Sequence, residues 1–254
     1  MENEATDDDL ARCHWPDLPP RYAAALRDVA SFIFARFEPQ AIVAAGSVVR
    51  GVGDRGSDLD VLVVHASPYK QRLQRWFGDV PVEIFVNPLP AIHACFASEH
   101  QRGRPSMAHM ITTGFPVLGA QAIDALRAEA GVWLKRRSAL TPEQDTGARY
   151  EAATLLEDGE DIADRDPACA SALLGEAVLA MVRYHLRVLN GVIPGNKRLL
   201  VELERGDPET AGLARRFFAA TGIEERLLAA RALADRTVRA RGFFEWESER
   251  IPVP

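Results

Sequence analysis

The chain has 254 residues, 47% of them hydrophobic, and a formal net charge of −6 at pH 7. This apolar content is sufficient for one large or two modest cores. The negative charge balance disfavours a general nucleic-acid binder, because such proteins carry a basic excess. This charge balance is better suited to binding a small molecule that is neutral or cationic.

The cysteines and the hydropathy profile bear on the compartment. Cys13, Cys95 and Cys169 are scattered, without metal-ligand spacing, and are expected to be free thiols. No apolar run approaches transmembrane length, and the start of the chain lacks the pattern of a signal peptide. We therefore expect a cytoplasmic protein that does not enter a membrane.

The first half of the chain mixes helical and strand patterns. Residues 1–20 are expected to form an N-terminal arm, which is loose over its acidic start at residues 1–9. Apolar spacing predicts a helix over residues 21–37. Buried strands are predicted at residues 41–45, 59–65 and 80–86, and a helix is expected to begin at residues 47–51. Residues 69–77 are expected to form a short helix or a loose connection. Helices are predicted at residues 88–99 and 106–113, and residues 115–118 either add a strand or lead out of the first domain.

From residue 120 onward the pattern is nearly all helical. Helices are predicted at residues 122–136, 142–163, 167–189, 196–204, 208–221 and 223–241. Thr141-Pro142 and Asp207-Pro208 each place a capping residue before a proline, which favours a helix start. We therefore expect an α+β protein with an arm at 1–20, a mixed-sheet domain at 21–120 and an all-helical bundle domain at 121–254.

Residues able to do chemistry gather around the second predicted strand. Gly46-Ser47 follows the first strand, and Asp58 and Asp60 stand at the head of the second. Side chains alternate along a strand, so both carboxylates point the same way and repel unless a cation lies between them. Glu83, in the middle of the third strand, also needs a partner if it is buried. The pattern predicts a site for a divalent metal and nucleotide phosphates.

This pattern resembles the nucleotidyltransferase superfamily, which has the polymerase-β-like fold. The likeness covers residues 40–87, and the residues that carry it are Gly46-Ser47, Ser57-Asp58-Leu59-Asp60 and Glu83. It implies a small mixed sheet flanked by helices. The helical half, with Tyr184 and the stretch from Gly195 to Leu200, is similar to the second domain of bacterial small-molecule adenylyltransferases, which include aminoglycoside-modifying enzymes.

The resemblance implies a reaction. ATP would be the co-substrate, held along Gly46-Ser47 together with two Mg²⁺ ions, and Asp58 and Asp60 would bind the metal. Glu83 would be the general base or a further metal ligand. AMP would pass to a hydroxyl of a small molecule, for which an aminoglycoside-like compound is one candidate, and pyrophosphate would leave.

Two further residues are candidates for contact with the nucleotide. Ser57 belongs to the motif. Lys197 is expected at a helix start, where the helix dipole does not favour a cation, so an anionic partner such as the triphosphate would explain it. The alternative is an ordinary solvated lysine.

The acceptor and the exact activity stay open at this point. An acidic run between residues 157 and 166 suits a polycationic acceptor, but a solvated helix face is the better explanation, because such charge runs usually face solvent. Two other activities fit the motif: a protein adenylyltransferase of the antitoxin type, and a nucleotide-binding regulator without turnover.

Overall fold

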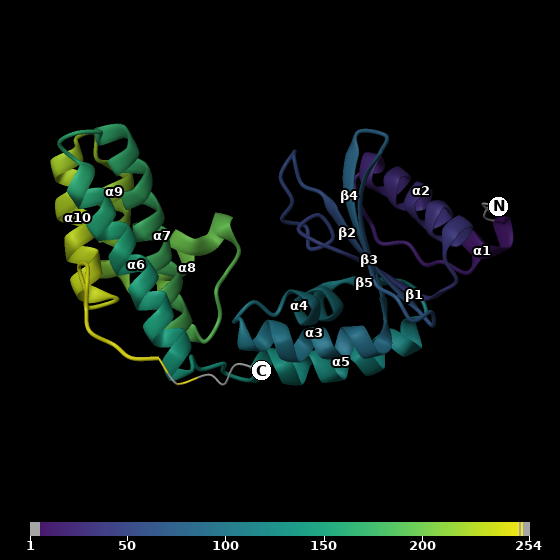
Figure 1. Cartoon of the computed structure of the whole chain (residues 1–254). Helices are drawn as coiled ribbons and strands as arrows, with labels where there is room; N and C mark the ends of the chain where they lie inside the picture. Colours follow the sequence, from purple (N-terminus) through teal and green to yellow (C-terminus); the bar gives the residue numbers. More distant parts are fainter. Residues whose placement is uncertain (1–5, 249, 251–254) are drawn as a thin grey trace. The chain divides into compact units, whose positions relative to one another are not determined.

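The computed structural model of the chain describes residues 6–248 and residue 250. It divides into two compact units, Met1–Arg136 and Arg137–Pro254 (Figure 1). The sequence analysis set the division at residue 120. Helix α5 (Ala120–Lys135) instead packs against α4 (Ser106–Thr113) and the sheet, so it belongs to the N-terminal unit.

A five-stranded mixed sheet forms the centre of the N-terminal unit, with the strand order β3-β4-β2-β1-β5. The strands are β1 (Pro39–Ala45), β2 (Leu59–His65), β3 (Gln71–Phe77), β4 (Val80–Pro88) and β5 (Phe115–Leu118). Strands β2 and β4 are parallel, whereas the other neighbouring pairs are antiparallel. With helices on both faces and a helical region following, this confirms the predicted fold class.

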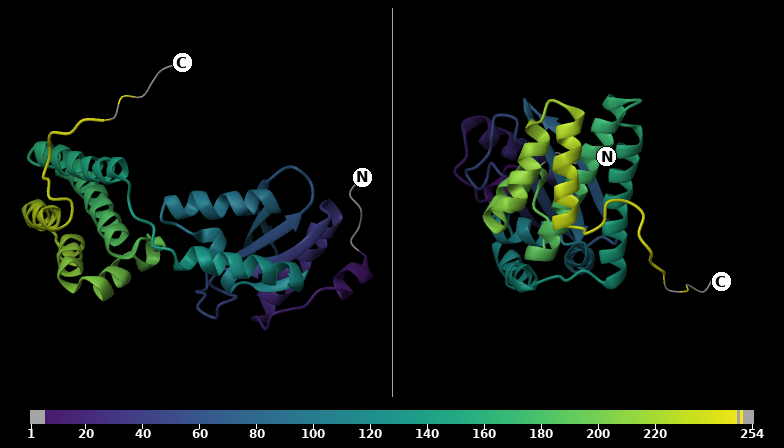
Figure 2. Two further views of the ribbon diagram at one scale, coloured as in Figure 1. Left: turned by 90° about the horizontal axis from the view of Figure 1, so that it is seen from below. Right: turned by 90° about the vertical axis from the view of Figure 1, so that its left-hand side faces the viewer.

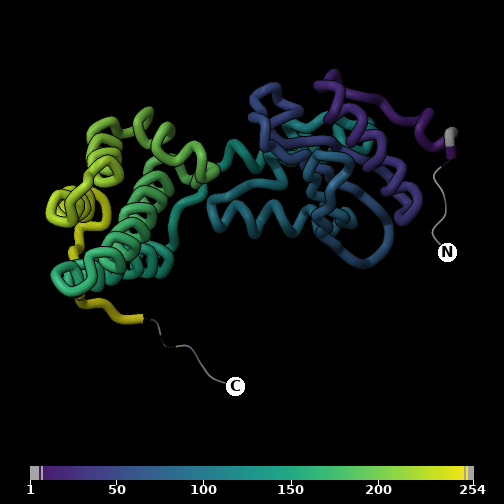
Figure 3. Tube along the Cα trace, turned by 90° about the horizontal axis from the view of Figure 1, so that it is seen from above, coloured from purple at the N-terminus to yellow at the C-terminus, as the bar shows by residue number. Residues whose placement is uncertain are grey.

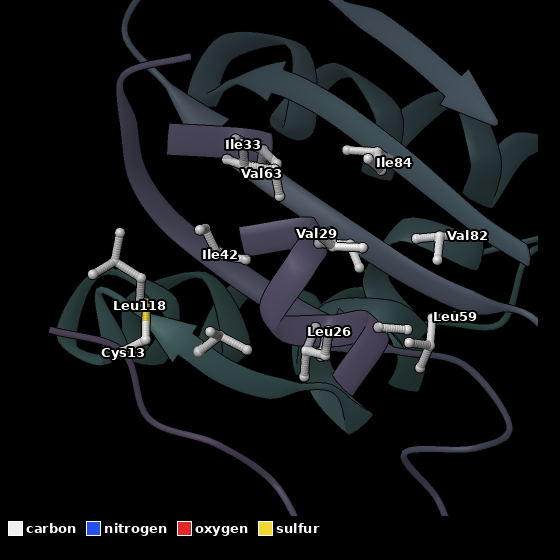
Figure 4. Packing of buried hydrophobic residues seen from close by; sticks show 14 of the residues in the cluster. Cys13, Leu26, Val29, Ile33, Ile42, Leu59, Val63, Val82, Ile84 and Leu118 are labelled. Carbon is white, nitrogen blue, oxygen red and sulfur yellow. The ribbon is translucent and has the colours of Figure 1, made fainter. Parts of the chain in front are cut away.

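Helices cover the two faces of the sheet unequally (Figure 1; Figure 2). Helix α2 (Pro20–Arg36) packs on one face through Leu26, Val29 and Ile33, as Figure 4 shows. Helices α3 (Leu89–Gln101), α4 and α5 pack on the other face. Strand β2 is buried on both sides, with Val63 toward α2 and Leu62 toward α3–α5. This double burial explains its continuous apolar sequence.

Strand β3 occupies most of residues 69–77, where a short helix or a loose connection was expected. This prediction was wrong because β3 is an exposed edge strand with a polar sequence, and it lacks the alternation that marks a half-buried strand. The overlooked signal was Gly78-Asp79 between two extended runs. Gly78 has a φ of +60°, and the register pairs Phe77 with Val80, so the two residues form a tight hairpin turn.

The N-terminal arm is more ordered than expected. Its first five residues lie outside the described part of the chain. Beyond them, Thr6 caps a short helix, α1 (Asp7–Ala11). Cys13 is buried in the core beside Leu118 (Figure 4), and the His14 amide donates to the Val117 carbonyl at 2.8 Å. The expectation of a loose segment is therefore wrong for residues 6–9, which belong to α1 and its cap.

The C-terminal unit is all helical within the described residues. Its elements are α6 (Pro142–Ile162), α7 (Pro167–Asn190), the 3₁₀ turn η1 (Asn196–Arg198), α8 (Leu199–Gly206), α9 (Pro208–Ala219) and α10 (Ile223–Arg236). Helices α6 and α7 run side by side (Figure 3), and α10 packs on α7 and α9. Thr141 and Asp207 cap α6 and α9 as predicted. No helix in the described part of the chain is long and apolar enough to cross a bilayer.

Candidate active site

The register of two parallel strands brings the predicted carboxylates together. Asp60 on β2 lies directly opposite Glu83 on β4, so the two side chains share one face of the sheet. Asp58 precedes β2 by one residue and points the same way as Asp60. One carboxylate oxygen of each residue lies within 4.8 Å of the others. The structure thus assembles the three acids, hereafter the acidic triad (Asp58, Asp60, Glu83).

The members of the acidic triad differ in their exposure to water. Glu83 is only 9% exposed and Asp60 is partly buried, whereas Asp58 faces solvent. Burial, reinforced by the negative charge of Asp58, raises the pKa of Asp60 to about 6. The positive charges of Arg50 and Arg72 act in the opposite direction. Like charges held this close are costly unless a cation neutralises them.

Arg72 on β3 is one such cation. Its Nε donates to Oε1 of Glu83, and its guanidinium lies 5.3 Å from the centre of the Phe85 ring. Phe85 is the residue directly opposite Arg72 in the β3–β4 pair. The sequence analysis missed this arginine because it did not predict β3. The Gly78-Asp79 hairpin signal would have placed Arg72 on the strand beside Glu83.

The Gly46-Ser47 segment passes directly beside Asp60, because Ala45 at the end of β1 pairs with Asp60. Gly46 has a φ of +95°, and a Cβ atom at this position would lie 3.0 Å from Oδ2 of Asp60. A side chain there would be strained and would crowd the acidic triad. The chain then forms successive turns rather than the expected helix start, because Gly51 takes a left-handed φ of +71°.

A chain of hydrogen bonds fixes the loop between β1 and β2. The Ser47 hydroxyl donates to Oγ of Ser57 at 3.0 Å. Ser57 in turn donates to Oδ1 of Asp54 at 3.0 Å and accepts from the Asp54 amide at 2.9 Å. The Tyr22 hydroxyl of α2 donates to the Ser57 carbonyl at 2.9 Å. Ser57 is therefore engaged within the loop, and Tyr22 is a supporting residue that the sequence analysis missed.

The remaining predicted contact, Lys197, belongs to the C-terminal unit. It lies on the exposed 3₁₀ turn η1 rather than on an α-helix. It is therefore not among the residues that the N-terminal unit gathers around the acidic triad.

The acidic run at residues 157–166 also belongs to the C-terminal unit, and part of it has structural partners. Glu160 accepts from Nε of Arg231 at 2.9 Å, and Glu157 accepts from the Phe243 amide at 3.1 Å. Asp166 caps α7. These hydrogen bonds favour a structural role for Glu157, Glu160 and Asp166 over a role in binding a polycationic ligand.

A pocket of about 270 Å³ opens beside the acidic triad. Its lining residues are Asp58, Gln74, Arg75, Trp76, Pro81, Val82 and Glu83. Gln74 lies directly opposite Glu83, and Trp76 lies opposite Pro81, so both side chains lie on the face that carries the triad. Trp76 is 71% exposed.

Comparisons with known proteins agree with this site. Residues 26–102 match the family model of the nucleotidyltransferase domain. A nucleotidyltransferase-like protein from Exiguobacterium sibiricum 255-15, solved at 1.90 Å, is similar over 85% of this chain and 73% of its own, with 14% identity and a TM-score of 0.50. At this identity the likeness concerns the fold. No curated protein matches the chain.

The matched segment contains the Gly46-Ser47 turn and the whole acidic triad. Residues 26–102 therefore form a nucleotidyltransferase domain, as the motif predicted. This domain supports nucleotidyl transfer as the broad activity, with a nucleotide as one substrate.

Proposed function

We propose that this protein transfers AMP from ATP to a hydroxyl group of a small molecule and releases pyrophosphate. The convergence of Asp58, Asp60 and Glu83 beside the Gly46-Ser47 turn is the observation that carries the proposal. It joins a cluster of negative charge to a segment where the backbone can approach a phosphate closely.

The acidic triad fits a divalent cation of the magnesium type. It offers only carboxylate oxygens, the donors that Mg²⁺ prefers, and they lie close enough together to share an ion. Asp58 and Asp60 would hold the metal, with Glu83 as a further ligand or as the base. Two bound Mg²⁺ ions would polarise the reacting phosphate and neutralise charge on the leaving pyrophosphate.

The side chains of the site supply positioning and a proton acceptor. Gly46 allows the triphosphate to lie against the backbone, and the Ser47 hydroxyl lies beside it. Arg72 binds Oε1 of Glu83, so Oε2 is the atom that would take the proton of the attacking hydroxyl or bind metal. The acceptor oxygen forms a bond to the α-phosphorus, and the bond from that phosphorus to pyrophosphate breaks. Lys197 is proposed as a further phosphate contact.

The test is pyrophosphate release from ATP with Mg²⁺, measured against aminoglycosides and other polyhydroxylated amines. Asp60→Asn is the matched control, since it removes one charge and almost no volume. Acceptor-dependent release by the wild type and a loss of at least about a hundredfold in the variant would support the proposal. Labelled AMP on a protein band instead of a small molecule would show a protein-modifying enzyme. ATP binding without release would show a regulator.

A further inference from the structure

The sheet of the N-terminal unit has two edges, and the structure protects only one of them. Strand β5 is four residues long and contains Pro116, which has no N–H to offer a further strand. The N-terminal arm also lies beside it, and the His14 amide donates to the Val117 carbonyl at 2.8 Å. Short edge strands, prolines and covering segments keep a sheet from pairing with another chain. The β5 edge is therefore poorly suited to receive a further strand.

Strand β3, at the other edge, lacks these devices. It is seven residues long, contains no proline and pairs with β4 in a continuous register. Within the described part of the chain, β4 is the only strand that pairs with it. Its two arginines do not screen the edge, because each side chain lies over its own unit. Arg72 binds Glu83, and Arg75 lies over the Phe32 ring. This open edge is a template for a further strand.

The backbone of β3 presents its free hydrogen-bonding groups at alternate residues. Phe77 pairs with Val80 across a two-residue turn, and in such a hairpin the residues that flank the turn exchange both backbone hydrogen bonds. The pattern alternates along the strand, so the N–H and C=O groups of Arg72, Gln74 and Trp76 point away from β4. Each of these residues offers one donor and one acceptor to a further strand.

The side chains of β3 indicate which strand fits this edge. Antiparallel pairing with β3 of a second copy, about a two-fold axis at Gln74, aligns the whole of both strands. Arg72 then lies opposite Trp76 of the partner subunit, which makes a favourable cation–π pair. Arg75 lies opposite the partner subunit's Leu73, so no like charges face each other. A two-fold axis at Arg72 or at Arg75 would instead place two arginines directly opposite each other.

We propose that β3 forms an interface between two copies of this chain, in which their sheets join edge to edge. The indole of Trp76, 71% exposed in the single chain, is covered by Arg72 of the partner subunit. Trp76 lines the pocket beside the acidic triad, so the partner's guanidinium borders this pocket. The two triads lie on the same face of one continuous sheet. This interface does not depend on the reaction that the site performs.

The test measures the mass of the full-length protein by sedimentation equilibrium over a range of concentrations, without nucleotide or metal. Gln74→Pro removes an N–H group that points to the open edge, and an edge strand tolerates proline at such a position. Gln74→Ala retains this N–H group and is the matched control. Phe243→Ala is a second control, because Phe243 is 83% exposed and belongs to the C-terminal unit.

We expect the wild type to form a dimer and Gln74→Pro to raise its dissociation constant at least about tenfold. Trp76→Ala should raise the constant about fivefold through loss of the cation–π pair, whereas Gln74→Ala and Phe243→Ala should change it little. A wild type that is monomeric at every concentration would overturn the interface. A dimer that folded Gln74→Pro leaves unchanged would also overturn it.

A charge exchange at the two-fold axis tests the register and does not require proline to be tolerated. Gln74→Lys and Gln74→Glu each place like charges opposite each other in their own dimer. Each variant alone should therefore associate more weakly than the wild type, whereas an equal mixture should form a dimer with one copy of each. A mixture that associates no better than the separate variants would overturn the pairing at Gln74.

Discussion

Asp60 on β2 and Glu83 on β4 lie directly opposite each other in a parallel register. With Asp58 just before β2, three carboxylates gather at this position. Burial of Asp60, reinforced by the negative charge of Asp58, raises the pKa of Asp60 to about 6. The site therefore carries an electrostatic cost at neutral pH that a divalent cation would relieve.

That cost makes Asp60→Asn a stabilising change in metal-free buffer. A carboxyl whose folded pKa is about 6 and whose usual value is 3.8 favours folding in its protonated form. The wild type thus loses stability as the pH rises between these two values. At pH 7 the variant should have a free energy of unfolding higher by about 1–3 kcal/mol.

Urea unfolding of both proteins at pH 7 and near pH 4 measures this effect. The difference should shrink at the lower pH, where Asp60 is protonated in the folded wild type. Added Mg²⁺ should stabilise the wild type more than the variant. A variant less stable than the wild type at pH 7 would contradict this account.

Gly46→Ala should impair nucleotide binding, and Gly51→Ala is its control. Both glycines have a positive φ, of +95° and +71°, so both substitutions cost about 1–3 kcal/mol of stability. Only the Cβ at Gly46 approaches the site, at 3.0 Å from Oδ2 of Asp60, whereas the Cβ at Gly51 meets nothing within 4 Å. Calorimetric titration with Mg-ATP should show a loss of affinity of about tenfold for Gly46→Ala alone. Equal losses in the two variants would argue against close approach of the nucleotide at Gly46.

Arg72→Gln should strengthen metal binding. The guanidinium of Arg72 neutralises Glu83 and competes with a cation for its carboxylate. Because the arginine side chain is 64% exposed, solvent weakens the pair, and we expect a gain in Mn²⁺ affinity of about two- to fivefold. Arg75→Gln removes the same charge from the other face of β3, where Arg75 lies 4.7 Å from the Phe32 ring centre. Mn²⁺ titration should show a higher affinity for Arg72→Gln than for Arg75→Gln. An equal change of affinity in both variants would show that the effect comes from the net charge of the protein and not from the contact with Glu83.

Asp207→Ala should destabilise the C-terminal unit. Asp207 caps α9 by accepting from the Thr210 amide at 3.1 Å and the Thr210 hydroxyl at 2.6 Å, and it also contacts Nε2 of His185 at 2.9 Å. Removing the Asp207 side chain should lower the free energy of unfolding by about 2–3 kcal/mol, as measured by thermal or urea unfolding. Glu209→Ala is the control, because Glu209 is 74% exposed and its ion pair with Arg236 contributes about 0–1 kcal/mol. Similar losses in the two variants would show that the cap contributes little.

The sequence predicts the acidic triad because its residues lie in strands whose pattern is strong. Burial on both faces gives β2 and β4 continuous apolar runs, so the positions of Asp60 and Glu83 within them stand out. The caps at Thr141 and Asp207 are equally local signals, and both were found.

The outer part of the site is harder to predict from the sequence. Edge strand β3 faces solvent along most of its length, so polarity does not alternate along it, and Arg72, Gln74 and Trp76 could not be placed. Helix α5 illustrates a different limit. Its apolar stripe shows that it is amphipathic but not which core it covers, so only the structure assigns it to the N-terminal unit.

Mn²⁺ binding measured by electron paramagnetic resonance, with a non-hydrolysable ATP analogue, tests the central claim most directly. The wild type should bind Mn²⁺, and Asp58→Asn and Asp60→Asn should each weaken it by at least about tenfold while remaining folded. Binding by both variants equal to that of the wild type would contradict a metal site at the acidic triad.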